Sequence, residues 1–168
     1  MIYYKKLDDA ATAQDGVYAL IERQWPATLD ENTLETTLEI TLENIHQKDH
    51  VKNKLTQDNW YPDAAPSMAL YQWIQQTQTD SMSDQQQQEQ EFRQRYRQEL
   101  IAHPEYWMSL LDKARNANLT LVFVGDSKLV NYSLINHTNI LAEFLEDELD
   151  RFNDASSPVC YAHLNKLD

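Results

Sequence analysis

A run of six apolar or β-branched residues in the last third of the chain, Leu119–Val124, constrains the fold more than any other segment. Both sets of alternating positions are apolar or β-branched, which predicts a strand covered on both faces. Gly125 ends the run, and a long amphipathic pattern follows over residues 136–152. Its apolar residues fall on one stripe and predict a helix packed on a sheet: Ile140, Leu141, Phe144, Leu145, Leu149 and Phe152.

Two earlier segments, Ile2–Leu7 and Gly16–Glu22, are also rich in strand-forming residues and predict two further strands. Helical spacing of apolar residues recurs between them and the late strand, over 30–55, 68–74, the second half of the glutamine-rich segment 75–90 onward to Ile101, and 104–114. We therefore expect an α/β fold: a single three-layer domain, residues 1–152, with a small, largely parallel β-sheet flanked by helices. Turn-forming residues at Ala155–Pro158 predict that 153–168 is a carboxyl-terminal extension.

Two serines are placed to begin helices. Ser67 precedes the helical segment that starts at Met68 and can cap it. Ser83, followed by Gln86, has the spacing of a capping box. Beyond that second serine, four residues recur on one predicted helical face: Phe92, Tyr96, Leu100 and His103.

The composition is strongly acidic. The chain holds 27 Asp and Glu against 14 Lys and Arg, a net charge of −13. Such a mean field repels nucleic acid and anionic membranes, and we expect neither as a partner. No segment approaches the roughly 20 apolar residues that span a bilayer, and the first residues lack the charged-then-apolar pattern of a leader, so we expect neither a membrane span nor a leader. A single cysteine, Cys160, can form no internal disulfide, which agrees with a reducing compartment, so we expect a cytoplasmic protein. We also expect a monomer or a weak homodimer.

Several common kinds of site are excluded or disfavoured. With only two glycines, Gly16 and Gly125, the chain contains neither the dinucleotide-binding fingerprint nor the phosphate-binding loop. We expect no cofactor. His46 and His50 lie four apart and could grip a metal ion, but no third ligand is indicated by spacing, so we expect a solvated helix end and no metal.

Charged residues follow two of the predicted strands. Arg23 comes after Gly16–Glu22, and Asp126 follows Gly125. Ligands of open α/β sheets bind beyond the carboxyl ends of strands, so both residues are site candidates. The alternative for Arg23 is a surface ion pair. Arg93 and Arg95 also have an alternative, because each lies four residues after a glutamate on the predicted helix and the pairs can form one solvated face.

Five segments occur in an order that resembles the domain-of-unknown-function family 488, in its YeaO-like branch: Asp15–Pro26, Ala65–Ser67 with Trp73, Phe92–Leu100, Leu119–Phe123 and Asn136–Leu145. The resemblance implies a small α/β domain with a few-stranded, largely parallel sheet, and it carries no established biochemical role. Members usually continue Trp25-Pro26 with Arg-Gly, whereas Ala27-Thr28 follows here, so a guanidinium that could bind an anion is missing. The segments near 39–58 and 127–135 are longer than in relatives.

Two hypotheses follow for function. The first is a pocket protein or enzyme that binds a small anionic or polar metabolite at the carboxyl edge of the sheet. Arg23 and Arg93 or Arg95 would bind the anion, Trp25 and Tyr96 would form an aromatic wall, and Asn136 would begin a helix whose dipole favours anions. His137 would carry a proton, with Asp126 orienting it or acting on substrate. The alternative for His137 is a histidine packed in the core.

The second hypothesis is a non-enzymatic acidic interaction or regulatory module. It is favoured because no recognised catalytic motif occurs in the chain. The two hypotheses differ in one geometric expectation. Arg23, Arg93, Arg95 and His137 should converge on one concave pocket under the first, and should lie in separate ion pairs or packing sites under the second.

Overall fold

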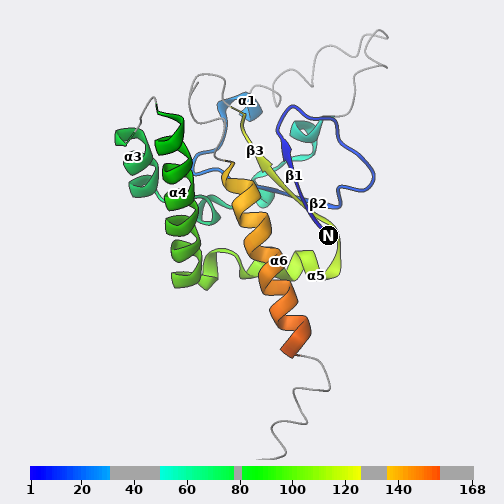
Figure 1. The fold of residues 1–168 in the computed structure, drawn as a ribbon. Coiled ribbons are helices and arrows are strands. Elements are labelled where there is room, and N and C mark those ends of the chain that lie inside the picture. Colours follow the sequence, from blue (N-terminus) through cyan, green and yellow to red (C-terminus); the bar gives the residue numbers. More distant parts are fainter. Residues whose placement is uncertain (31–49, 78–80, 126–135, 156–168) are drawn as a thin grey trace, which may run out of the picture.

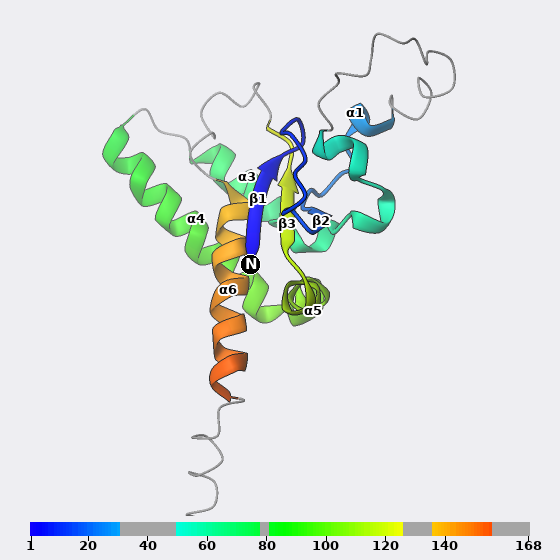
Figure 2. The same ribbon diagram turned by 90° about the vertical axis from the view of Figure 1, so that its right-hand side faces the viewer.

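Three parallel strands form one sheet, in the order β1 (Ile2–Lys6), β3 (Leu119–Phe123), β2 (Val17–Leu20). The computed structural model, drawn in Figure 1, describes residues 1–30, 50–77, 81–125 and 136–155, and Figure 2 shows β3 between the two early strands. The first four residues of β3 are buried. The prediction of a small parallel sheet with Leu119–Val124 at its centre is confirmed.

Helices cover one face of this sheet. They are α3 (Met68–Gln76), α4 (Met82–Ala102), α5 (Met108–Asn116) and α6 (His137–Ala155), which Figures 1 and 2 show gathered beside the strands. Short elements pack mainly on the other side: α1 (Ala27–Asp30), η2 (Val51–Lys54) and η3 (Gln57–Asn59). Two further 3-10 turns, η4 (Pro62–Ala64) and η5 (Pro104–Tyr106), lie in connections.

The sheet separates two clusters of buried apolar side chains. Leu121 and Ala19 belong to the larger cluster with the helices, whereas Val122 and Leu20, the next residues in each strand, belong to the smaller one. Alternate residues of a strand point to opposite faces, so both faces are packed. This gives the three-layer α/β arrangement that the sequence predicts.

The amino end of β2 is fixed by Asp15 and Gly16. Gly16 has a φ of +69°, and a Cβ at this position would come 2.1 Å from the carbonyl oxygen of Asn118, so only glycine fits. The buried carboxylate of Asp15 accepts hydrogen bonds from Lys5, Tyr18 and both the backbone N–H and the hydroxyl of Thr12. Thr120 of β3 donates to the Asp15 carbonyl at 2.8 Å. This turn therefore joins all three strands.

The predicted helix boundaries are confirmed only in part. Ser67 caps α3 as predicted, since its hydroxyl accepts from Leu70 N at 3.1 Å. The capping prediction for Ser83 is wrong, because α4 begins at Met82, after Ser81. Phe92, Tyr96 and Leu100 are buried as predicted, whereas His103 is exposed beyond the helix end.

Two other expectations are corrected. The helix predicted to continue to Leu55 does not reach it, because residues 51–54 form η2 and bond to the loop after β1, with Val51 N donating to Asp9 O and Lys52 N to Leu7 O. His50 pairs with Ala10 in an isolated bridge, and residues 31–49, with His46, lie outside the described residues. Phe152, predicted in the buried stripe, is 39% exposed, with the Arg115 guanidinium 4.8 Å from its ring centroid.

Residues 153–155 belong to α6, so this helix continues three residues past the predicted domain end. The rest of the predicted extension, including Cys160, lies outside the described residues. Within the described segments, no helix combines the length and the apolar composition needed to cross a bilayer.

Asp15 makes the fold sensitive to acid. Burial raises the pKa of its carboxyl, but the hydrogen bonds from Lys5, Thr12 and Tyr18 together outweigh burial and hold that pKa far below its usual 3.8. A depressed folded-state pKa contributes stability that is present above pH about 4 and is lost as the pH falls below it. Asp15→Asn should lower the free energy of unfolding at pH 7 by about 2 kcal/mol and flatten its decline below pH 4, measured by urea unfolding. The exposed Asp150→Asn is the control, and an equal decline in both variants would contradict this role.

Candidate functional site

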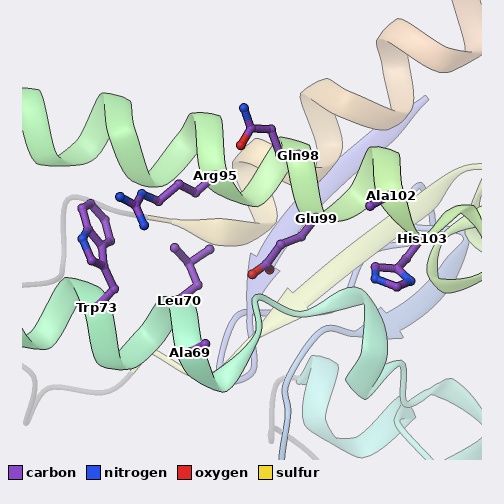
Figure 3. Close-up of a pocket in the computed structure, with 8 residues that line it drawn as sticks. All are labelled: Ala69, Leu70, Trp73, Arg95, Gln98, Glu99, Ala102 and His103. Carbon is purple, nitrogen blue, oxygen red and sulfur yellow. The ribbon is translucent and has the colours of Figure 1, made fainter.

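A groove of about 420 Å³ lies between α3 and α4 (Figure 3). Ala69, Leu70 and Trp73 line it from α3, and a stripe of α4 from Arg95 to its cap His103 lines it from the other side. The α4 residues are spaced three and four apart, so they form one helical face. The helices run in opposite directions, since Ser67 contacts Glu99 and Trp73 contacts Arg95.

A stacked pair of side chains closes one end of this groove. The Arg95 guanidinium lies 4.2 Å from the centroid of the Trp73 ring, an attractive cation–π geometry. Glu91 holds the guanidinium in place, because its Oε1 accepts from Nε at 3.0 Å and from Nη2 at 2.6 Å. The predicted pair between Glu91 and Arg95 is therefore present. It orients the arginine over the indole.

Glu99 fixes the distance between the two helices. Its Oε2 accepts from Ser67 N at 3.1 Å, and its Oε1 accepts a short hydrogen bond from the Ser67 hydroxyl. The same serine hydroxyl accepts from Leu70 N as the cap of α3. One side chain of α4 thus binds the first turn of α3, which keeps the groove between them open and defined.

Arg23 lies at the carboxyl end of β2, as predicted, but its donors face the protein. Nε donates to Pro66 O at 2.8 Å and Nη2 to Ala65 O at 3.1 Å. Its contact to Asp63, at 3.8 Å to an exposed carboxylate, adds little. The hydroxyl of Tyr96 donates to Ala64 O at 2.5 Å. These two side chains therefore satisfy three consecutive carbonyls of a connector in which Ala64 and Ala65 are buried.

Glu22, beside Arg23, is a second carboxyl in an unusual environment, after Asp15. It is largely buried and accepts from Val124 N at 2.9 Å, which links the ends of β2 and β3. Burial raises its pKa to about 7, although the Val124 hydrogen bond acts in the opposite direction. Its backbone carbonyl accepts from the indole of Trp60 at 2.6 Å, and the Trp60 ring meets Trp25 edge-on. Sequence analysis missed Glu22; a charged residue directly after a strand buried on both faces was the available signal.

His137 begins α6. Its Nε2 lies 2.7 Å from Ile21 O, and because a carbonyl only accepts, Nε2 carries the hydrogen. Burial lowers the pKa of His137 despite that bond, and the positive end of the α6 dipole also disfavours a cation. The imidazole is therefore neutral at pH 7, and its ring is nearly perpendicular to that of Tyr71, with the two centroids 6.4 Å apart. Asn136 caps the helix, since its side-chain oxygen accepts from Thr138 N at 3.0 Å.

The predicted site residues do not meet in the groove. Arg93 forms its ion pair with Glu143 of α6 rather than with Glu89, and only Arg95 lines the space between α3 and α4. Arg23, Tyr96, Asn136 and His137 contact backbone or capping partners. Trp25 packs against the smaller cluster on the opposite face of the sheet. Asp126 lies outside the described residues.

The described residues include no group of three or more His, Cys, Asp or Glu placed to hold a metal ion.

The comparison with protein families agrees with the sequence resemblance. Residues 40–162, well over half of the chain, match the family model described as the inactive DUF488-N3 subclade. The chain belongs to the DUF488 family. The match begins after Asp15–Pro26 and covers the later segments on which the resemblance rests. No curated protein and no solved structure matches the chain.

Glu22 predicts an unusual pH dependence of stability. A carboxyl whose folded pKa is raised costs stability as the pH rises from its ordinary value, 4.5, to about 7, because the unfolded chain loses its proton first. Glu22→Gln keeps an acceptor for Val124 N and removes the ionisation. This variant should gain up to about 3 kcal/mol over wild type at pH 8 and nothing at pH 4.5, measured by urea unfolding. The exposed Glu146→Gln should track wild type, and a gain equal at both pH values would refute the assignment.

Arg23 predicts a loss of stability on conservative replacement. Arg23→Lys keeps the charge but cannot donate two hydrogen bonds in the fixed geometry that Ala65 O and Pro66 O require. We expect the free energy of unfolding to fall by roughly 1–3 kcal/mol. Arg115→Lys, at an arginine 3.8 Å from Asp112, is the matched control and should change little. Equal stability of the two variants would show that the Arg23 hydrogen bonds are dispensable.

Proposed function

We propose that this chain is a non-enzymatic interaction module that binds a partner protein in the α3–α4 groove. The observation that carries the proposal is that the described candidate residues bind the protein itself. Arg23 and His137 bind backbone carbonyls, Arg93 binds an acid on α6, and of the arginines and histidine named in the first hypothesis only Arg95 lines the groove. Such separate ion pairs and packing sites are what a module without catalysis would have.

The chemistry of His137 supports the absence of catalysis. A general acid or base must reach the proton it transfers, and the Nε2 hydrogen of His137 is already donated to Ile21 O. The neighbouring cation, Arg23, donates its hydrogen bonds to the carbonyls of Ala65 and Pro66 in the connector. The name of the matched family model, an inactive subclade, supports the same conclusion.

The groove supports the second half of the proposal. Its floor of Ala69, Leu70 and Ala102 is apolar, and the stacked Trp73 and Arg95 supply the residue types that dominate the energetics of protein interfaces. Both walls are helices that Glu99 fixes to each other, so little ordering is required when a partner binds. Met68 and Ile101, next in the chain to two floor residues, are 54% and 63% exposed.

A small anionic or polar metabolite at the carboxyl edge of the sheet is the second candidate. Tyr71 favours it, because its ring meets the imidazole of His137 at this edge of the sheet. Burial raises the pKa of the Tyr71 hydroxyl, and the charges of Glu22, Arg23 and Glu99 all act on it. Thermal shift against phosphorylated and carboxylated metabolites tests this candidate, since a ligand at 100 times its Kd adds about 2.7 kcal/mol. A metabolite whose affinity falls in Arg23→Lys would favour it over the interaction module.

We further propose a cytoplasmic location and a monomer or weak homodimer, with no affinity for nucleic acid. The single cysteine and the net charge of −13 support these expectations. Sedimentation of the full chain at several concentrations tests the oligomeric state.

If the chain is an interaction module, two substitutions in the groove should weaken the binding of its partners. A peptide-display library of random sequence, selected on the full chain, should yield binders that Trp73→Ala weakens about 30-fold or more, the loss expected of an interface tryptophan. Ala102→Gln starts from an exposed site and fills the groove without opening the core, so it should weaken the same peptides.

The control is Met108→Ala, which changes an exposed residue of α5 outside the groove. Circular dichroism establishes that each variant is folded. If no peptide is enriched, or if the selected peptides bind Ala102→Gln and Met108→Ala equally, the proposed function is wrong.

A further inference from the structure

We infer that the occupant of the α3–α4 groove is a basic, amphipathic helix of a partner protein. The inference rests on the proposed function and adds to it the conformation and the charge of the partner. Shape, apolar content and charge each contribute to it.

The shape of the groove fits a short helix. The α4 face from Arg95 to His103 extends about 12 Å at a helical rise of 1.5 Å per residue, which equals about two turns. The antiparallel helices supply two ridges of side chains, and a third helix can lay its apolar face between them. Figure 3 shows Leu70 projecting from α3 toward α4 and Ala69 on α3, with Trp73 and Arg95 at one end and His103 at the other.

The apolar content of the groove fits one face of such a helix. Ala69 and Ala102 have small side chains, so the floor can accept large apolar side chains from outside. The exposed Met68 and Ile101 extend the apolar surface along the chain at both walls. A partner with apolar residues three and four positions apart presents a stripe of matching width.

The charges around the groove favour a basic partner. Glu99 lines the groove, Glu91 holds Arg95 at one end, and Glu105 accepts from His103 at the far end, so the carboxylates at the groove outnumber the cations that line it. Both hydrogen bonds of Arg95 go to one oxygen of Glu91, so the second oxygen has no donor among the described residues. The net charge of the chain, −13, attracts a cationic segment from a distance and repels an acidic one.

Three synthetic peptides of 16 residues test the inference. They share one stripe of leucines at positions three and four apart and differ only in the polar face, which is lysine and arginine, glutamine, or glutamate. Binding to the full chain is measured by fluorescence anisotropy. The basic peptide should bind at least 10-fold more tightly than either of the others, and its affinity should fall as salt rises from 50 to 300 mM.

Substitutions separate groove binding from general attraction to an acidic surface. Ala102→Gln should abolish binding of the basic peptide, and Glu91→Gln, which keeps the acceptor for Arg95, should weaken it several-fold. Glu146→Gln removes an exposed charge on α6 and is the matched control that should leave binding unchanged. If Ala102→Gln binds the basic peptide as well as wild type does, the attraction is non-specific and the inference is overturned.

The remaining outcomes distinguish this inference from the proposed function. Equal or tighter binding of the acidic or neutral peptide, lost in Ala102→Gln, overturns the basic partner and leaves the interaction module standing. Display selection of groove binders with no affinity for any of the three helical peptides has the same effect. Self-association of the chain that Ala102→Gln abolishes assigns the groove to a second copy and overturns the inference. If display selection yields no groove binder and none of the three peptides binds, the proposed interaction module is wrong as well.

Discussion

Parallel pairing of β3 with both of its neighbours is the constraint on which the rest of the structure depends. The late strand β3 lies between β1 and β2, which both come from the first 20 residues. Because β3 is parallel to β2, the chain that joins them must return from the carboxyl end of β2 to the amino end of β3. Parallel strands require such long connections, and here the connection from β2 to β3 contains α3, α4 and α5. The groove exists because this connection folds back on one face and pairs α3 with α4.

The crossover creates a problem that the charged residues at the carboxyl edge solve. Residues 64–66 pass through a packed region in which their carbonyls need donors. Among the described residues, no backbone N–H of a strand or helix donates to them. Tyr96 and Arg23 do so instead. A guanidinium at the end of a parallel strand is the arrangement expected of an anion site, yet here it has a structural partner. The position of Arg23 in the sequence does not distinguish an anion site from a structural role. The hydrogen bonds of its guanidinium do.

The matched family model is described as an inactive subclade, and at the carboxyl edge of the sheet the described Arg23 and His137 bind backbone carbonyls. The groove adjoins this edge. It depends on Ser67, Glu99 and the stacked Trp73 and Arg95, which hold the two helices in register. Ser67 follows Pro66, whose carbonyl binds Arg23, and the charges of Glu99 and Arg23 both act on Tyr71, so the two surfaces are neighbours.

The sequence by itself determined the local features of this protein. The strand Leu119–Phe123, the cap at Ser67 and the buried face of α4 follow from apolar spacing and from the bonding capacity of one side chain, which act over a few residues. Tertiary structure alone decided the partners of the charged residues. Arg93 could bind Glu89 on its own helix or Glu143 fifty residues away, and packing of α4 on α6 selected the distant acid. Tertiary packing likewise placed Arg23 and His137 beside backbone carbonyls. A hydrogen bond to a buried acceptor that would otherwise lack a donor stabilises the fold more than an ion pair at the surface does.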